Sequence, residues 1–226
     1  MSPYIVAIDG PAGSGKSSVS KEVARRLGFG YLDTGAAYRA LAWASLSDPK
    51  LALDRLASAE LAKDFDYSIS VNPSDYWVRV GGTDVTGAIR EGKIAESVSK
   101  VAGIASVRAF MKLKTLQLVE QAPYEAVVVE GRDITTVVAP DAKVRILLTA
   151  REAVRLERRS AELSGANTAT VERQVLERDA SDSKVVDFMT PAPGVQLVDS
   201  SDLNFEQTVQ AVIDLIEQGS SKDSND

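Results

Sequence analysis

The chain has 226 residues, of which 44% are hydrophobic, enough for one well-packed α/β domain with small excursions built into it. Its 32 acidic and 26 basic residues leave a net charge of −6, which argues against a broad nucleic-acid or membrane-binding surface. Neither cysteine nor histidine occurs, which excludes disulfides, thiolate metal sites and imidazole catalysis.

The first predicted elements are a strand and a helix joined by a glycine-rich loop. The apolar run 4–8 has the length and β-branched content of a buried parallel strand, and residues 17–27 continue as a helix with one apolar side. Residues 10–17 read GPAGSGKS, a complete GxxxxGK[ST] motif in the order strand, loop, helix. The alternative, a turn that merely joins the two elements, is disfavoured by this context.

The loop predicts a bound nucleoside triphosphate with magnesium. Its glycines allow backbone N–H groups to surround phosphate oxygens, at the positive end of the following helix. Lys16 would reach the β- and γ-phosphates, and the Ser17 hydroxyl would bind Mg²⁺. The loop leaves the phosphoryl acceptor open. The expected triphosphate-binding residues are Gly10, Pro11, Ala12, Gly13, Ser14, Gly15, Lys16, Ser17 and Ser18.

The next elements build a small insert. Residues 29–32 predict a short strand that ends at Asp33, and Thr34 is the expected N-cap of a helix from 36 to about 46. Residues 53–62 have helical spacing. Two alternating segments, 65–71 and 75–80, predict strands of a small antiparallel sheet, with turns at 72–74 and at Gly81 and Gly82.

The second half of the chain returns to long elements. A helix is expected from about 105 to 120, followed by a buried parallel strand at 126–129 that leads into Glu130 and Asp133. The helix expected at 151–163 is dense in Arg and Glu, so we expect it to be exposed to solvent or mobile. The remaining expectations are a strand at 144–148, a polar helix at 171–180, a strand at 195–198, an amphipathic helix at 205–218 and a disordered tail at 219–226.

Strands that alternate with helices predict an α/β fold, a parallel sheet with helices on both faces. Ligands of such sheets lie at the carboxyl ends of the strands. We therefore expect one domain over 1–226 and a site formed by the groups at those ends. These groups are residues 10–17, 33–34 and 130–133 and the corner at Asp199.

Four further segments carry a resemblance to one family. They are LDTGAAYR at 32–39, TDVTGAIR at 83–90, SKVAGIASVR at 99–108 and EGRDITTVVAPDA at 130–142. Together with GPAGSGKS they make the chain similar, over essentially its whole length, to bacterial-type cytidylate kinases. The resemblance implies a P-loop NTPase fold with a monophosphate-binding insert at 36–103 and a helical lid at 151–184. It also implies transfer of the ATP γ-phosphoryl group to CMP or dCMP with Mg²⁺, in pyrimidine nucleotide metabolism.

The resemblance assigns Ser99, Arg108 and Asp133 to cytosine, with Thr34 and Tyr38 nearby. A carboxylate can accept from the cytosine amino group while an arginine donates to N3 and O2. Uracil would place an oxygen against that carboxylate, at a cost of about 1–3 kcal/mol. Taken alone, Ser99 and Arg108 also fit ordinary surface positions, and Asp133 fits a structural partner of Arg132.

Other residues resemble the family's phosphate contacts. Arg39 and Arg132 correspond to its clamp on the CMP phosphate, a task that suits the guanidinium fork. Arg178 and Asp182 correspond to positions that hold the sugar and phosphate of CMP. The chain departs from the pattern at Val185, where the family usually has arginine, and the neighbouring residue is Lys184.

Three arginines, Arg155, Arg158 and Arg159, fall in the segment that corresponds to the lid. Arg155 and Arg159 are expected to be catalytic, and Arg158 is expected to contact ATP. The other expected catalytic residues, Lys16 and Arg132, lie outside this segment. The alternative is a solvated charged helix face. Glu130 stands where many relatives have Asp, and either it or Asp33 is expected to hold Mg²⁺ through water.

The resemblance implies a mechanism without a general base, because a phosphate monoester is largely ionised near neutral pH. Two alternative functions are a nucleotide-dependent switch and a kinase of another acceptor such as UMP. The sequence lacks the NKxD motif by which guanine-selective switches recognise their base, which disfavours the first alternative. No secretory signal or membrane span is apparent. The expected partners are ATP, CMP and dCMP, without nucleic acid or membrane, for a cytoplasmic monomer.

Overall fold

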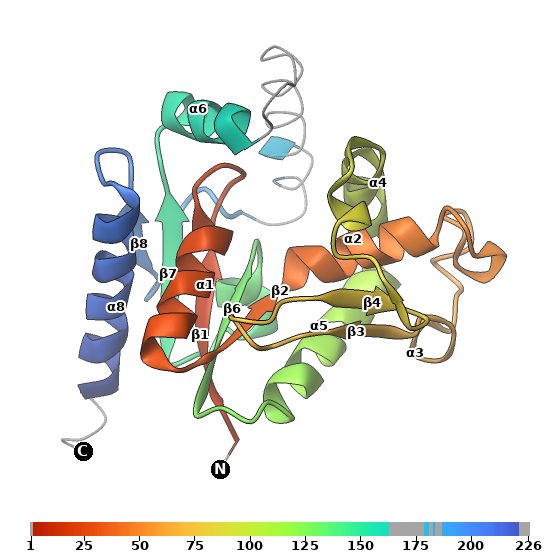
Figure 1. The fold of residues 1–226 in the computed structure, drawn as a ribbon, viewed down its shortest axis with the longest axis horizontal. Helices are drawn as coiled ribbons and strands as arrows, with labels where there is room; N and C mark the ends of the chain where they lie inside the picture. The colour runs from red at the N-terminus through yellow and green to blue at the C-terminus, as the bar shows by residue number, and fades with distance from the viewer. Residues whose placement is uncertain (1, 163–178, 181–182, 184–186, 222–226) are drawn as a thin grey trace. The chain divides into compact units, whose positions relative to one another are not determined.

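The computed structural model describes residues 2–162, 179–180, 183 and 187–221 (Figure 1). The chain divides into two compact units, one made of Met1–Tyr31 with Pro123–Asp226 and the other of Leu32–Ala122. The α/β class predicted from the sequence is confirmed by a five-stranded sheet that alternates with helices along the chain. Within the described residues, no helix has the length and apolar character that crossing a membrane requires.

The main sheet has the strand order β2-β6-β1-β7-β8. The pairings of β1 with β6, of β1 with β7 and of β7 with β8 are parallel. Ile8 is in register with both Glu130 and Ile146, so the ends of three neighbouring strands meet at one edge, where the glycine-rich loop begins. The strands are β1 (Tyr4–Asp9), β2 (Gly30–Asp33), β6 (Ala126–Gly131), β7 (Val144–Thr149) and β8 (Gln196–Asp199).

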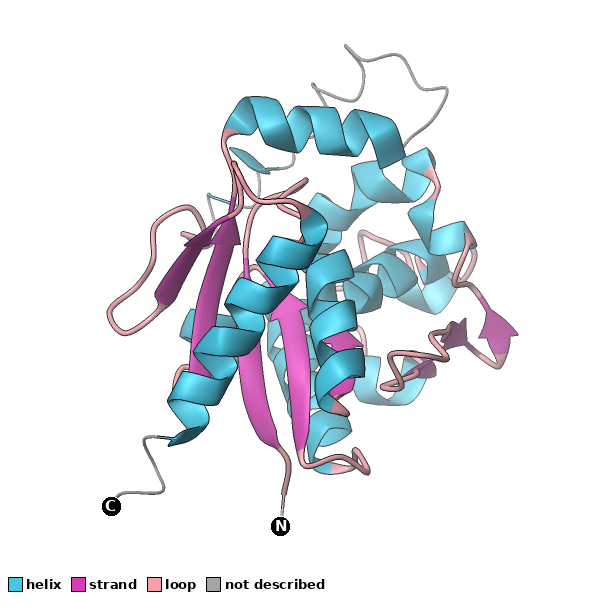
Figure 2. Cartoon of the chain, turned by 60° about the vertical axis from the view of Figure 1, so that its left-hand side comes forward, coloured by secondary structure: helices cyan, strands magenta, loops and turns pink. Residues whose placement is uncertain are grey.

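Two helices of the first unit, α1 and α8, lie side by side against the sheet (Figure 2). The apolar side of α1, with Val19 and Val23, is buried there, as its sequence spacing predicted. α8 continues to Ser221, so the first three residues of the expected tail are helical, and 222–226 lie outside the described residues. Among the described residues, the α-helices of this unit include α1 (Lys16–Leu27), α6 (Glu152–Glu162) and α8 (Phe205–Ser221).

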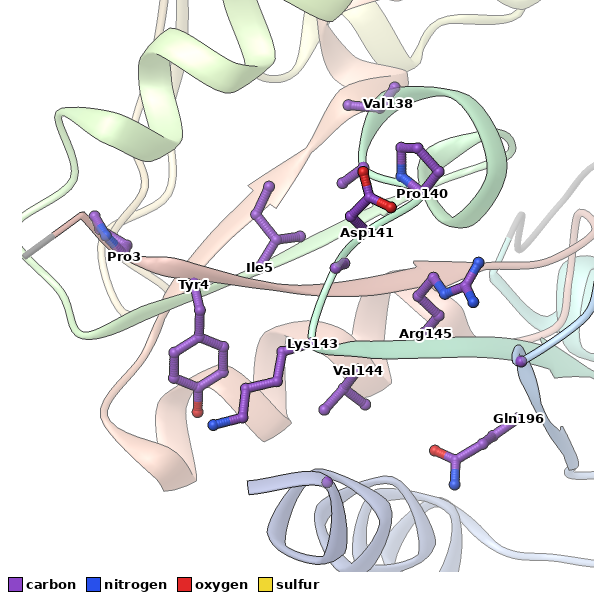
Figure 3. A pocket seen from close by; sticks show the side chains of 14 residues that line it. Pro3, Tyr4, Ile5, Val138, Pro140, Asp141, Lys143, Val144, Arg145 and Gln196 are labelled. Atoms are coloured by element: carbon purple, nitrogen blue, oxygen red, sulfur yellow. The ribbon is translucent and has the colours of Figure 1, made fainter. Parts of the chain in front are cut away.

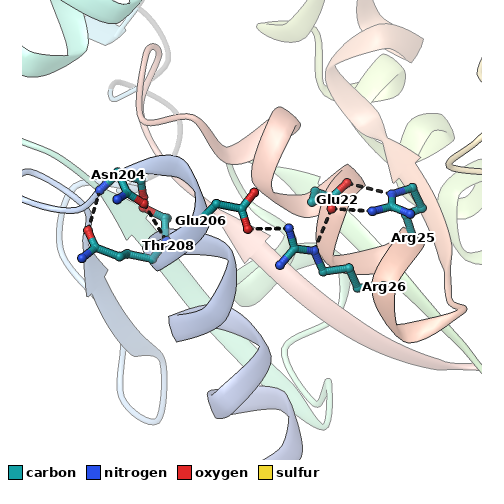
Figure 4. Close-up of polar contacts among 7 residues, drawn as sticks. Glu22, Arg25, Arg26, Asn204, Glu206 and Thr208 are labelled. Atoms are coloured by element: carbon teal, nitrogen blue, oxygen red, sulfur yellow. Dashed lines mark hydrogen bonds and ion pairs between the residues drawn. The ribbon is translucent and has the colours of Figure 1, made fainter.

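Polar contacts on the surface join α1 to the start of α8 (Figure 4). Glu22 accepts from Arg25 and Arg26, and Arg26 also donates to Glu206 on α8 at 2.6 Å. The first turn of α8 is closed by a reciprocal pair, in which the side chains of Asn204 and Gln207 each accept from the other's backbone N–H at 2.9 Å. These bonds satisfy helix donors that would otherwise lack partners.

The second unit contains helices that pack on one another and a small sheet. α2 packs against α4 and α5, and a stacked pair of aromatic rings, Phe65 and Tyr67, lies near Phe110 of α5. The predicted antiparallel sheet is confirmed, with shorter strands and a third strand, β5. The elements are α2 (Thr34–Ala44), η1 (Pro49–Leu51), α3 (Leu61–Asp64), β3 (Tyr67–Ile69), β4 (Val78–Val80), β5 (Thr83–Asp84), η2 (Ala88–Arg90), α4 (Gly92–Ala102) and α5 (Ala105–Glu120).

Two local predictions for this unit were wrong, and one helix was missed. Asp33, and not Thr34, is the N-cap of α2, because the Asp33 carboxylate accepts from the Ala36 N–H at 2.9 Å while Thr34 is already helical. The helix expected at 53–62 is absent over 53–58, which form a series of turns with bonds such as Ser58 N–H to Arg55 C=O that span three residues; only 61–62 are helical, as the start of α3. The helix α4 was not predicted.

Candidate active site

The glycine-rich loop is packed so tightly that two of its positions admit no side chain. A Cβ at Gly10 would lie 2.1 Å from the Leu148 carbonyl oxygen, and one at Gly13 would lie 2.4 Å from the Arg155 carbonyl oxygen. Gly13 also has a φ of 75°, which L side chains rarely adopt. Gly15, with a φ of 85°, precedes the first residue of α1, Lys16. The first N–H groups of α1 therefore form the anion-binding end of a helix.

Ser17 and Glu130 meet at this loop. The Ser17 hydroxyl donates to Glu130 Oε1 at 2.6 Å, and the Tyr31 hydroxyl donates to the same oxygen at 3.3 Å. Glu130 is only 2% exposed, at the end of β6. A hydroxyl and a carboxylate beside a triphosphate site are ligands that suit Mg²⁺, which binds a few protein oxygens and completes its shell with phosphates and water.

Asp33, the other candidate for the metal, has local tasks instead. Its Oδ1 caps α2, and its Oδ2 accepts from the Tyr76 hydroxyl at 3.4 Å. Within the described ranges, no cluster of three or more Asp, Glu, His or Cys side chains could hold a metal ion by itself. Since the Asp33 carboxylate is engaged in these local bonds, Glu130, which contacts Ser17, is the better supported of the two carboxylates.

The sequence analysis missed Asp9, the last residue of β1. Its carboxylate accepts from the backbone N–H groups of Ile134 and Thr135 at 2.9 and 2.7 Å and from the Thr135 hydroxyl at 2.6 Å. Burial raises the pKa of Asp9, against these bonds and the charge of Lys16. Asp9 thereby holds the π-helical turn Ile134–Val138, which follows Arg132 and Asp133. A carboxylate that ends an apolar strand directly before the loop was the available signal.

Two of the predicted catalytic arginines converge on one carboxylate, that of Asp179. Arg132 donates to its Oδ1 at 2.7 Å and Arg155 to its Oδ2 at 2.6 Å. Asp179 also accepts from the Ala12 N–H of the loop at 3.1 Å. Arg155 is only 3% exposed, so the expectation that this helix is solvent-exposed or mobile is wrong at this position.

Arg158 joins three segments of the same unit. Its guanidinium donates to the Ser200 hydroxyl at 2.9 Å and to the Ser200 carbonyl at 2.8 Å, at the end of β8. It also donates to the Ser14 carbonyl at 3.4 Å, so it connects α6 to the glycine-rich loop. Arg159 is half-buried on the same helix. Lys16 donates to the Pro11 carbonyl at 3.3 Å, within its own loop.

The residues expected at the acceptor nucleotide are distributed along the chain. Thr34, Tyr38 and Arg39 lie on α2, Ser99 on α4 and Arg108 on α5, all in the second unit, whose helices α2, α4 and α5 pack together. Thr34 is buried and the other four are half-buried. Arg132 and Asp133 lie in the first unit. Arg178, Asp182, Lys184 and Val185 lie outside the described residues, as do most of the helix expected at 171–180 and much of the segment 151–184.

A cavity of about 820 Å³ lies at the opposite end of the strands (Figure 3). Its lining includes Tyr4 and Ile5 at the start of β1, Lys143 and Arg145 at the start of β7, and Gln196. The Arg145 guanidinium is engaged with the carbonyls of Thr135 and Pro193. This cavity shares none of the groups described above and is separate from the glycine-rich loop.

Comparisons with known proteins give one consistent family. A family model described as cytidylate kinase matches residues 6–218. A cytidylate kinase of Cutibacterium acnes is 45% identical over 95% of this chain and 96% of its own length. One of Streptomyces avermitilis is 41% identical over 95% and 93%. Among solved structures, TT1252 from Thermus thermophilus has a TM-score of 0.50 at 18% identity, over 95% of this chain and 98% of its own, which supports the fold alone.

Proposed function

Because this chain belongs to the cytidylate kinase family, we propose that it transfers the γ-phosphoryl group of ATP to CMP and dCMP, with Mg²⁺. The observation that carries the proposal is the position of two arginines beside the glycine-rich loop: Arg155 donates to the Ala12 carbonyl, and Arg132 is linked to the Ala12 N–H through Asp179. A loop that only stored a nucleotide would not need two further guanidinium groups beside it. The same loop thus has the charges that transfer of a phosphoryl group requires.

On the donor side, the proposal assigns the ATP phosphates to residues 10–18 and gives Lys16 the β- and γ-phosphates. Ser17 would hold Mg²⁺ directly, and Glu130 would hold it through water. The 2.6 Å bond between these two side chains supports the pairing. When bound, the metal neutralises phosphate charge. Arg158 would support the donor nucleotide through Ser14 and Ser200.

On the acceptor side, Arg39, Arg132 and Arg178 would bind the CMP phosphate, because guanidinium groups stay ionised and bind two oxygens at once. Asp133 would accept from the cytosine amino group, while Arg108 donates to its acceptor atoms. These assignments rest on the family and on the chemistry of the side chains. The other proposed CMP contacts are Thr34, Tyr38, Ser99 and Asp182.

The proposed reaction is an in-line displacement. A phosphate oxygen of CMP attacks the γ-phosphorus, the bond from that phosphorus to the bridging oxygen of ADP breaks, and ADP leaves with the electron pair. The second pKa of a phosphate monoester is about 6, so the nucleophile is already ionised at neutral pH. Alignment and charge stabilisation then suffice, in a chain without histidine. Arg155 and Arg159 would stabilise the transferring group.

The test is a steady-state comparison of ATP consumption with CMP, dCMP, UMP, AMP and GMP at equal concentration. We expect CMP and dCMP to have the highest kcat/KM and UMP to follow at a reduced value. A better acceptor among the other three would refute the substrate assignment, and no stimulation by any acceptor would favour a nucleotide-dependent switch. We further propose a monomer in the cytoplasm, where its charged nucleotide substrates are found.

A further inference from the structure

Asp179 lies at the centre of a buried group of charges that the proposed roles of the arginines do not explain. Its carboxylate accepts three hydrogen bonds: from Ala12 and Arg132 at Oδ1, and from Arg155 at Oδ2. The side chains of Arg132, Arg155 and Asp179 are only 16%, 4% and 10% exposed. A carboxylate shared by two guanidinium groups fixes the distance and the orientation of one relative to the other.

The position of each arginine is defined by a second contact as well. Arg155 donates to the Ala12 carbonyl at 2.8 Å, so Ala12 is bound through both its carbonyl and its N–H. The guanidinium carbon of Arg132 lies 4.3 Å from the ring centre of Phe188, a cation–π contact with a side chain that is 2% exposed. Asp179 therefore connects two independently anchored arginines to the glycine-rich loop.

Arg155 keeps a buried donor that has no partner among the described residues, its Nε–H. A buried charged donor without an acceptor is costly, so natural proteins keep such groups at sites where a ligand satisfies them. An oxygen of a bound phosphate would supply this acceptor beside Ala12. The bond to Asp179 uses Nη1 of Arg155 and leaves Nε for that purpose.

The electrostatics agree with a permanent anion at this place. Burial alone would raise the pKa of Asp179, but the charge of Arg132 and hydrogen bonds from Arg132, Ala12 and Arg155 outweigh it and hold the pKa below its ordinary value. The carboxylate thus stays ionised at neutral pH. Its single negative charge leaves the two guanidinium groups with a net positive charge for phosphate oxygens.

We propose that Asp179 is a positioning residue for phosphoryl transfer, which holds Arg132 and Arg155 in a fixed arrangement beside the glycine-rich loop so that both arginines face the transferring group together. The proposal rests on the function proposed above. It assigns to Asp179 no contact with substrate. Its effect on the reaction passes through the two arginines.

The test compares Asp179→Asn with Asp202→Asn in the full-length protein. Asp202 makes a similar ion pair with the Arg151 guanidinium, at the start of α6, but both side chains of this pair are exposed. At saturating ATP and CMP, we expect Asp179→Asn to lower kcat by about 100-fold, the scale of a catalytic group displaced by 1 Å. ATP affinity, measured with a non-hydrolysable analogue, should change little, and Asp202→Asn should match the wild type.

A second readout needs no activity. In nucleotide-free protein, nitrogen-detected NMR of the arginine side chains should show slowed guanidinium rotation for Arg132 and Arg155, assigned with Arg132→Lys and Arg155→Lys. In Asp179→Asn, the guanidinium groups of both arginines should rotate faster. A folded Asp179→Asn variant with wild-type kcat overturns the proposal, even if it binds CMP more tightly. Unchanged arginine signals in this variant overturn it as well.

Two further controls separate the possible failures. If Asp179→Asn does not fold, Asp179→Glu is the variant to measure, because it keeps the charge but moves the carboxylate. We expect its kcat to be about tenfold lower than that of the wild type. Wild-type turnover in this variant would overturn the proposal. If the wild-type protein does not phosphorylate CMP, the proposed function fails, while the NMR comparison still tests the positioning of the arginines.

Discussion

Replacing Glu130 by Gln tests whether this carboxylate controls Ser17, the proposed magnesium ligand. The substitution keeps the shape of the side chain and one acceptor oxygen but removes the charge. The hydrogen bond from the Ser17 hydroxyl to Glu130 Oε1 is 2.6 Å long, a length typical of a charge-assisted bond, and its acceptor is buried. We expect the amide to orient Ser17 less strongly and to attract a hydrated cation less.

The magnitude follows from this one bond. Hydrogen bonds to charged groups contribute about 1.5–3 kcal/mol and neutral ones about 1 kcal/mol, so loss of the charge costs about 0.5–2 kcal/mol. Since about 1.4 kcal/mol corresponds to a factor of ten, the Mg²⁺ concentration for half-maximal activity should rise by about 2- to 30-fold. This agrees with the roughly 10- to 100-fold losses that follow the removal of groups that orient metal ligands.

The assay is a magnesium titration of CMP phosphorylation at saturating ATP and CMP. Tyr31→Phe is the matched control, because it removes the second and longer bond to the same oxygen, at 3.3 Å, without changing the charge. We expect this variant to stay within about threefold of the wild type, the scale of a weak neutral hydrogen bond. A Glu130→Gln variant with an unchanged magnesium dependence would refute the role of Glu130.

Three other predictions test separate parts of the site. Lys16→Ala should lower kcat by at least about 1,000-fold while the circular dichroism spectrum stays native, because the charge at the β- and γ-phosphates is lost; near wild-type turnover in folded protein would exclude that role. Asp133→Ala should reduce the ratio of kcat/KM for CMP over UMP by about tenfold, since the carboxylate that distinguishes an amino group from an oxygen is gone; an unchanged ratio would assign base selection elsewhere. Because the folded state holds the pKa of Asp179 below its ordinary value of 3.8, this carboxylate stabilises the fold above that pH, and the contribution is lost as the pH falls through the lower folded value. Urea unfolding should therefore show a stability gap between wild type and Asp179→Asn that is constant near neutral pH and shrinks below pH 3.8, and a gap that widens in acid would contradict this.

Much of the main sheet could be predicted because its strands are continuous apolar runs bounded by glycine or charge. The residues of 126–129 are fully buried in β6, and the run 4–8 forms β1 with one further residue, Asp9. The insert was harder to predict, because its turns at 53–58 use three-residue hydrogen bonds that leave an apolar spacing similar to that of a helix. Leu56 in these turns is fully buried, so the apolar residue at this position is explained by tertiary packing and not by helix formation.

The candidate site likewise contains residues that could be predicted from the sequence and residues that could not. The loop motif predicted Lys16 and Ser17 because backbone geometry and chemistry are both encoded in eight consecutive residues. No such motif marks Asp9 or Asp179, because each has a partner more than 100 positions distant in the sequence, Ile134 for Asp9 and Ala12 for Asp179; the only local signal was the place of Asp9 at the end of an apolar strand. A buried carboxylate and an exposed one look alike in a sequence, and only the fold shows which donors surround it.

The most direct test of the account is the stoichiometry of the reaction. Purified protein is incubated with ATP labelled at the γ-phosphate and with excess CMP, and the labelled products are separated by chromatography. We predict one labelled CDP for each ATP consumed, with little free phosphate, because the proposed roles of Lys16, Arg132 and Arg155 direct the phosphoryl group to a second nucleotide. Release of the label as inorganic phosphate at the same rate with and without CMP would contradict the account.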